Sequence, residues 1–199
     1  MHSANPKSKT EILKIAIPLF AREGFSGISM RRLADEVGFN AASLYHHFPD
    51  KETLYIATIK YAFADKAQRL TEPLTMSAPP RERLKLLITR LCQQTHDDPD
   101  FSRLVQREIL KGDEKRLELV AKEVFQNMFQ GISELCRELG PDYDAHLLTF
   151  SIIGLVVYHY QTAPIRLFLP GGKAEHNDPE VVAHHVTALL LHGFRPPAG

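Results

Sequence analysis

The sequence predicts an all-α fold of about nine helices. Two observations support this prediction. Apolar residues recur at three- and four-residue spacing through most of the 199 residues, and strand-like runs are absent. Glycines, prolines and capping residues separate the helical patterns at the places where helices usually begin or end. A hydrophobic content of 44% is ample for a core in a chain of this length.

The first helix is predicted to begin at Ser8, because Ser8-Lys9-Thr10-Glu11 fits a capping box, in which serine and glutamate side chains satisfy each other's backbone N–H groups. Apolar residues follow at helical spacing until Gly24. Pro18 lies within this pattern and has no N–H to donate, so we expect a kink or irregular hydrogen bonding there.

Two short helices are predicted next, over residues 29–37 and 40–47. Gly38 stands where a helix commonly ends at positive φ, and Asn40 can cap the following helix with its side-chain oxygen. Pro49 prevents that helix from continuing. Two helices joined by a short turn that contains glycine match the helix-turn-helix pattern, whose second helix enters the DNA major groove.

A fourth helix, capped by Asp50, is predicted from Lys51 to about Leu70, and the proline-rich stretch 71–80 is the expected join between two parts of the chain. We therefore predict a DNA-binding domain over 1–50, a connecting helix over 51–70 and a helical domain over 71–199. The helices expected in the last part are three amphipathic ones over 84–95, 101–109 and 117–135, and two more apolar ones over about 142–163 and 179–194.

Charge and motifs exclude several classes of protein. The net charge is zero, so a nucleic acid must be bound through local charge, and residues 1–62 carry eight Lys/Arg against six Asp/Glu. The apolar run 147–157 is shorter than the roughly 20 residues of a membrane span. The polar N-terminus predicts no secretory signal, and Cys92 and Cys136 are expected to be reduced core thiols, so we expect a cytoplasmic, nucleoid-associated protein. No catalytic, cofactor or metal-binding motif is present, and we expect no enzymatic activity, cofactor or metal.

Residues 10–60 resemble the DNA-binding region of the TetR family of bacterial transcriptional regulators. The similarity lies in the order of several motifs: "LFAREGFSGISM", Leu33-Ala34, Val37-Gly38, Leu44-Tyr45, His47-Phe48 and "KETL" from Lys51. The resemblance implies a DNA-binding regulator whose helical C-terminal domain binds a ligand and forms a homodimer. It favours a repressor that a small-molecule inducer releases from a palindromic operator. A constitutive DNA-binding protein without small-molecule input is the alternative.

The resemblance and the helix-turn-helix pattern together assign candidate DNA contacts. Asn40, Ala41, Ala42 and Ser43 begin the second helix of the motif and are candidates to face base edges, although Asn40 can instead only cap its helix. The candidates for phosphate contacts are Ser29, Arg31, Tyr45, His46 and Lys51. For three of these an ordinary structural role is the alternative: a solvated salt bridge for Arg31, core packing for Tyr45 and simple exposure for His46.

The second half of the chain offers candidates for ligand binding and dimerisation. Glu108 lies on an otherwise apolar helix face, where an unpaired carboxylate would be unfavourable, so it is either an ion-pair partner or a polar anchor for a ligand. The other ligand-binding candidates are apolar or mildly polar, as is typical of small-molecule pockets: Phe125, Met128, Phe129, Tyr158 and Gln161. The candidates for a four-helix dimer interface are Phe150, Gly154, Val182, Val186, Leu189 and Leu190.

Overall fold

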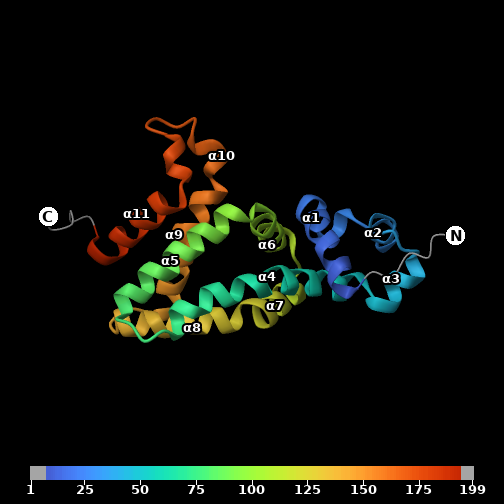
Figure 1. Cartoon of the computed structure of the whole chain (residues 1–199), viewed down its shortest axis with the longest axis horizontal. Coiled ribbons are helices and arrows are strands. Elements are labelled where there is room, and N and C mark those ends of the chain that lie inside the picture. The colour runs from blue at the N-terminus through green and yellow to red at the C-terminus, as the bar shows by residue number, and fades with distance from the viewer. Residues whose placement is uncertain (1–7, 194–199) are drawn as a thin grey trace. The chain divides into compact units, whose positions relative to one another are not determined.

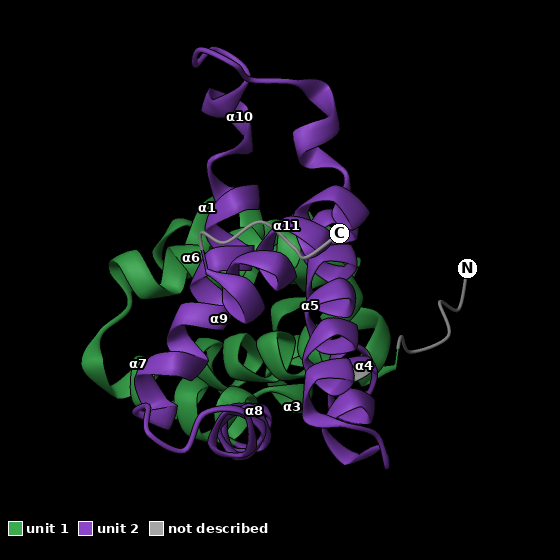
Figure 2. Ribbon diagram, turned by 90° about the vertical axis from the view of Figure 1, so that its left-hand side faces the viewer, with its two compact units in different colours: residues 1–65, 99–126 green, residues 66–98, 127–199 purple. Residues whose placement is uncertain are grey.

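The computed structural model describes residues 8–193, and its regular structure across this range is helical, which confirms the predicted fold class (Figure 1). Contacts divide the chain into two compact units (Figure 2): unit 1 holds Met1–Asp65 and Pro99–Gln126, and unit 2 holds Lys66–Asp98 and Asn127–Gly199. The helices in the described range are α1 Lys9–Gly27, α2 Met30–Val37, α3 Ala41–His47, α4 Lys51–Thr75, α5 Pro80–Asp97, α6 Pro99–Lys111, α7 Glu114–Val120, the π-helical turn η1 Ala121–Phe125, α8 Gln126–Leu139, α9 Ala145–Gln161, α10 Ala163–Arg166, the 3-10 turn η2 Ala174–Asn177 and α11 Pro179–His192.

The capping box at the start of α1 is confirmed. The Ser8 N–H donates to Glu11 Oε2 at 2.6 Å, and the Glu11 N–H donates to Ser8 Oγ at 3.3 Å. The helical dihedrals of α1 are interrupted at Gly24, where φ is 72°, and not at Pro18, where we expected the irregularity. Glycine reaches this positive φ at little steric cost, so the bend lies at the residue that tolerates it best.

Unit 1 is built around α1, which packs against both α2 and α6. Tyr55 of α4 is fully buried, and its ring meets the Phe20 ring edge-on at 4.8 Å. Further along α4, the Phe63 ring stacks with Phe101 of α6 at 5.7 Å and meets Phe125 edge-on at 5.1 Å. These aromatic contacts join the start of the chain to the 99–126 segment in one core.

Helix α4 runs to Thr75, five residues beyond the predicted end at Leu70. Pro73 lies inside it and cannot donate to the Arg69 carbonyl, four residues earlier. The guanidinium of Arg90, on α5, donates to that carbonyl instead, at 2.8 Å. Arg83, also on α5, donates to the carbonyls of Pro73 and Leu74. Two arginines therefore satisfy the acceptors that the proline and the helix end leave open.

Unit 2 is a helical bundle in which α5 packs against both α9 and α11. Inside it, the hydroxyls of Ser133 on α8 and Thr149 on α9 form a buried hydrogen bond of 3.0 Å. Both cysteines are free and buried in this unit, as the sequence predicts. The first of the two apolar helices, expected over 142–163, ends at Gln161, and its continuation is the separate short helix α10.

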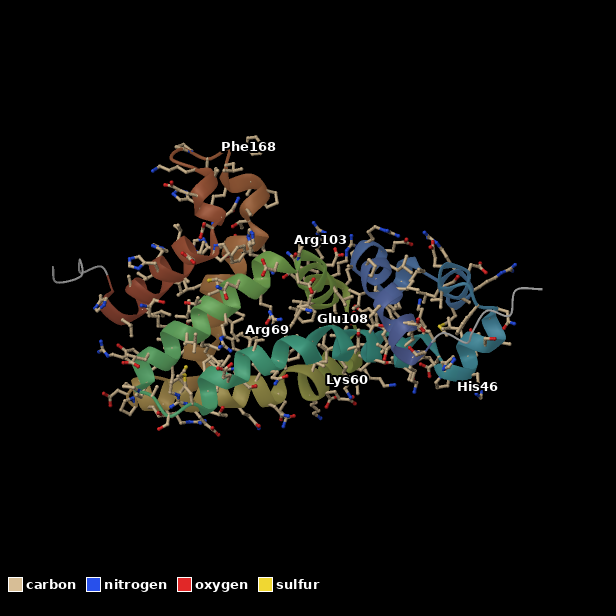
Figure 3. All side chains as sticks on the ribbon, viewed as in Figure 1. His46, Lys60, Arg69, Arg103, Glu108 and Phe168 are labelled. Atoms are coloured by element: carbon tan, nitrogen blue, oxygen red, sulfur yellow. The ribbon has the colours of Figure 1, made fainter. Side chains whose placement is uncertain are left out.

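The segment between α9 and α11 projects from the other helices of unit 2 (Figure 1). Arg166 of α10 holds its base, since its guanidinium contacts His159 Nδ1 at 2.8 Å and donates to the Asn177 side chain. Beyond this point apolar side chains face solvent, and Phe168 is 86% exposed (Figure 3). The sequence reading missed this projection.

Candidate nucleic-acid interface

Helices α2 and α3 form the predicted helix-turn-helix, and each boundary is made by the residue that the sequence indicates. Ser29 caps α2 by accepting from the Arg32 N–H at 3.2 Å. Gly38 ends α2 in the left-handed region, with φ of 78°. Asn40 caps α3 by accepting from the Ser43 N–H at 2.8 Å. Its side-chain amide N–H₂ remains available as a donor.

The surface of α3 presents several of the predicted DNA contacts together. Asn40, Ala42 and His46 are exposed, and Ala41 and Ser43 are half-buried. Tyr45 is 48% exposed, so it does not belong to the core as the alternative for this residue required. His46 lies at the end of this short helix (Figure 3). The side chains in the first turn of α3, those of Ala41, Ala42 and Ser43, are small, which allows a close approach to base edges.

Neighbouring aromatic and charged contacts fix α3 and α2 in place. The His47 ring stacks on the Phe39 ring at 5.8 Å, and Phe48 is 2% exposed, so these two residues support the reading helix from behind. Arg32 forms a two-pronged ion pair with Glu23 of α1, at 2.6 and 2.8 Å. Arg31 is exposed and has no ion pair within residues 8–193, which leaves its charge available to a phosphate.

Lys51, the first residue of α4, is half-buried. Its ammonium donates to the Ile28 carbonyl at 3.1 Å and lies 4.3 Å from the centre of the Phe25 ring. Burial, followed by the positive charge of Arg116, lowers the pKa of this ammonium. Ile28 directly precedes Ser29, so two of the predicted phosphate contacts, Lys51 and Ser29, lie beside the start of α2.

Glu108 is the ion-pair partner that one of the two sequence readings required. Its carboxylate is 3% exposed and accepts from Arg116 Nε at 3.0 Å. Figure 3 labels Glu108 on α6. Asp113, which caps α7, also pairs with Arg116. The guanidinium of Arg116 lies 4.2 Å from the centre of the Phe25 ring. Sequence reasoning missed Arg116 and this use of Phe25. The Asp113-x-x-Arg116 spacing signals a cap, but nothing in the sequence places α7 beside α1.

The other ligand-binding candidates lie in different surroundings. Met128 is 8% exposed, Phe125, Phe129 and Gln161 are half-buried, and Tyr158 is 67% exposed. Tyr158 shares one exposed stripe of α9 with Phe150 and Gly154, at helical spacing. Its position therefore fits the predicted dimer interface better than the wall of a pocket.

The dimer-interface candidates divide in a similar way. Phe150 is 56% exposed, and a Cβ at Gly154 would have no neighbour within 4 Å. On α11 the prediction needs a correction. Val182 and Val186 are 3% and 0% exposed, because α11 packs against α5 and α9 within the same chain. Leu189 and Leu190 are half-buried, and the exposed residues near the start of α11 are Glu180, Val181, His184 and His185.

Membrane-spanning helices and metal-binding clusters are absent from the described part of the chain. Across residues 8–193, no helix is both long and apolar enough to cross a membrane. In the same range, no three His, Cys, Asp or Glu side chains are grouped closely enough to hold a metal ion.

Two family models match most of the sequence. Residues 12–58 match the model of bacterial regulatory proteins of the tetR family. Residues 80–194 match the model of the C-terminal domain of the HTH-type transcriptional dual regulator CecR. Among curated proteins, the HTH-type transcriptional regulator YerO of Bacillus subtilis is 26% identical over 77% of this chain, and the match spans 54% of the length of YerO.

Solved structures share the fold over almost the whole chain. FadR of Bacillus subtilis, in complex with stearoyl-CoA, has a TM-score of 0.77 and 18% identity, and the match covers 94% of this chain and all of that one. AibR, in complex with isovaleryl coenzyme A and operator DNA, has a TM-score of 0.72 and 21% identity, and the match covers 92% of this chain and 97% of that one.

Proposed function

The chain belongs to the TetR family of bacterial transcriptional regulators, and we propose that it represses transcription as a homodimer until a small-molecule inducer releases it from a palindromic operator. The observation that carries this proposal is the exposed α3 surface, capped by Asn40 and supported from behind by His47 and Phe48. This arrangement suits a helix that enters the major groove. The protein then acts in the cytoplasm, on the DNA of the nucleoid.

A two-fold operator requires two reading helices one DNA turn apart, about 34–36 Å, or a multiple of that distance. One chain supplies one such helix, so dimerisation is part of the proposal. The α9 stripe of Leu147, Phe150, Gly154 and Tyr158 supports an interface there, because it exposes large apolar side chains around a glycine that permits close approach. Exposed residues at the start of α11, together with Leu189 and Leu190, complete the proposed interface.

For the inducer we propose an acyl-CoA thioester. FadR and AibR, which share this fold over more than nine-tenths of the chain, hold stearoyl-CoA and isovaleryl coenzyme A respectively. Within unit 2, the apolar Met128 and Phe129 suit an acyl chain, with Gln161 as a polar contact. Phe125 and Glu108 belong to unit 1 and are left out of this proposed site, and Arg116 already neutralises the Glu108 carboxylate. To release DNA, the inducer must bind the DNA-free conformation more tightly than the DNA-bound one.

The test begins with a pool of random duplexes, from which the protein should enrich a palindromic sequence. Fluorescence polarisation then measures binding of that duplex against a shuffled one at moderate salt. Equal affinity for the two would refute sequence-specific binding. Isovaleryl-CoA and stearoyl-CoA are then titrated into the complex, with free coenzyme A as the matched control. Release by an acyl-CoA alone supports the proposed inducer, whereas a complex unaffected by any small molecule supports the constitutive alternative.

A further inference from the structure

One aromatic ring in unit 1 is contacted by two cations from different helices. The Phe25 ring lies 4.2 Å from the guanidinium carbon of Arg116 on α7 and 4.3 Å from the ammonium of Lys51 on α4. Each contact is favourable, because a cation is attracted to the negative face of an aromatic ring. The two cations repel each other. Burial is the larger cause of the lowered pKa of Lys51, and this repulsion is the second cause.

Two carboxylates offset the positive charge of Arg116. Glu108 and Asp113 both pair with its guanidinium, and Glu108 is almost fully buried. Arg116 is therefore fixed by α6 on one side and by the start of its own helix on the other. A guanidinium held at several of its donors has one preferred orientation, which fixes its place beside the Phe25 ring.

A second link between the first turns of α7 and α4 involves Lys115, the residue next to Arg116. Lys115 pairs with Glu52 at 3.9 Å, and its positive charge is one of the smaller influences that lower the pKa of Asp50. Two residues of α7 are thus linked to the start of α4: Arg116 to Lys51 through the Phe25 ring, and Lys115 to Glu52 directly. Asp50 lies within reach of the Lys115 charge. Asp50, Lys51 and Glu52 begin the helix that follows the reading helix α3.

Lys51 is held in one place by these contacts. One N–H of its ammonium donates to the Ile28 carbonyl, and the Phe25 ring lies against the ammonium. An ammonium has three donors, so two remain for a phosphate. A long side chain that is already immobilised loses less conformational freedom when it binds.

We propose that Arg116 is a positioning residue for DNA binding, which acts through the Phe25 ring on the Lys51 ammonium and so sets the phosphate contact of Lys51. This inference rests on the proposed function. Glu108 lies on α6 and Arg116 on α7, so a shift of α6 against α7 would withdraw the guanidinium from the ring. The phosphate contact of Lys51 then depends on the α6–α7 turn as well as on α4.

The test is a cycle of variants read out by the salt dependence of DNA binding, with the duplex enriched by the wild-type protein. Arg116 is removed in the double variant Glu108→Gln/Arg116→Gln, which leaves no unpaired buried charge. Each phosphate contact contributes about 0.9 to the slope of log K against log salt. We expect Lys51→Ala to reduce the slope by about this amount and the double variant to reduce it by a measurable part of it. In the triple variant, the double change should add nothing to Lys51→Ala.

Two further variants separate positioning from general damage. Phe25→Leu removes the ring, keeps an apolar side chain at this half-buried position, and should reduce the slope as the double variant does. Arg103→Gln removes an exposed arginine of α6 that pairs with Asp100 of the same helix, and it should leave the slope unchanged. Thermal unfolding establishes which variants fold, and Phe25→Leu carries the test if the double variant does not.

Two outcomes would overturn the inference. The first is that the double change lowers the slope equally in the wild-type protein and in the Lys51→Ala variant. This result would mean that Arg116 acts independently of Lys51. The other is a wild-type slope in Phe25→Leu. Failure of the wild-type protein to enrich any duplex would instead refute the proposed function, and this inference with it.

Discussion

The carboxylate of Glu108 accepts a hydrogen bond from Arg116 Nε at 3.0 Å, and only 3% and 11% of the two side chains are exposed. A buried pair of this kind contributes little net stability compared with apolar residues of similar size. Removing Arg116 is different, because it leaves the Glu108 carboxylate buried and uncompensated, whereas Arg116 without Glu108 keeps its ion pair with Asp113. The fold of unit 1 is therefore most sensitive to substitution of Arg116.

We predict that Arg116→Ala lowers the free energy of unfolding by about 3–5 kcal/mol, measured by urea denaturation, because it leaves Glu108 buried without its partner. The matched control is Lys122→Ala, since Lys122 pairs with Glu118 in solvent and its loss should barely move the midpoint. Replacing both partners, as Glu108→Leu/Arg116→Met, should recover much of the loss. A single variant as stable as the wild type would show that the buried charge is compensated in another way.

Lys51→Ala and Ser43→Ala should affect DNA binding differently. Loss of Lys51 removes a phosphate contact, so affinity should fall for all duplexes and the salt slope should drop by about one contact. Loss of the Ser43 hydroxyl should change the base preference at one position and leave the slope intact. Selection from random duplexes, followed by polarisation at several salt concentrations, separates the two effects. A changed base preference in Lys51→Ala and a reduced salt slope in Ser43→Ala would mean that Lys51 contacts a base and Ser43 a phosphate.

Phe150→Glu should convert the dimer into a monomer, because it places a charge in the proposed α9 interface. Phe168→Glu is the matched control, since this residue is even more exposed but lies on the projecting segment. Leu189→Glu on α11 should act as Phe150→Glu does. Sedimentation velocity gives the mass of each variant. A dimeric Phe150→Glu protein would remove α9 from the interface, and a monomeric Phe168→Glu protein would add the projection to it.

The two cysteines should be unreactive in the folded protein. Burial raises the pKa of the Cys92 thiol to about 11 and also raises the pKa of Cys136, so the reactive thiolate is scarce at neutral pH. A chromogenic disulfide reagent at pH 8 should detect no thiol until denaturant is added, and then two. Ser77→Cys, at an exposed position, provides the positive control with one rapidly reacting thiol. Rapid reaction of the native wild type would contradict the buried positions.

Acid should weaken the start of α4 through Asp50. Its carboxylate accepts from the Thr53 N–H at 2.7 Å, and hydrogen bonds of this kind lower its pKa. The stabilisation is therefore present above the pKa of the unfolded state, near 4, and is lost as the pH falls through the folded value. Asp50→Ala should lower the free energy of unfolding by about 1 kcal/mol at neutral pH and by less in acid. Asp50→Asn keeps a cap that does not titrate, so its difference from wild type should shrink in acid as well.

Local signals in the sequence predicted the reading head well. The caps at Ser8, Ser29 and Asn40 and the left-handed Gly38 depend on residues within a few positions of one another, and the structure has all of them. The end of α4 could not be predicted in this way. From the sequence, Pro73 predicts the end of a helix. In the structure the helix continues, because Arg90 from the next helix donates to the carbonyl that Pro73 leaves without a donor.

The candidate sites show the same division between local and distant information. An isolated carboxylate on the apolar face of α6 indicated that Glu108 needs a partner, but the identity of that partner depends on how α6 and α7 fold back on each other. The spacing of apolar residues in α11 also correctly predicted that they share one face of the helix. Which neighbour covers Val182 and Val186 is decided by tertiary packing, and here it is the same chain.

The composition of unit 1 has a consequence for making hybrid regulators. This unit joins the reading head to residues 99–126, in which Phe101 stacks with Phe63 of α4 and Arg116 contacts the Phe25 ring of α1. A chimera that exchanges only the first 50 or 70 residues between relatives would cut through this core and pair Phe25 and Lys51 with an unrelated α7. Exchange of DNA specificity should succeed more often when the 99–126 segment is transferred together with the reading head, or when only the exposed residues of α3 are replaced.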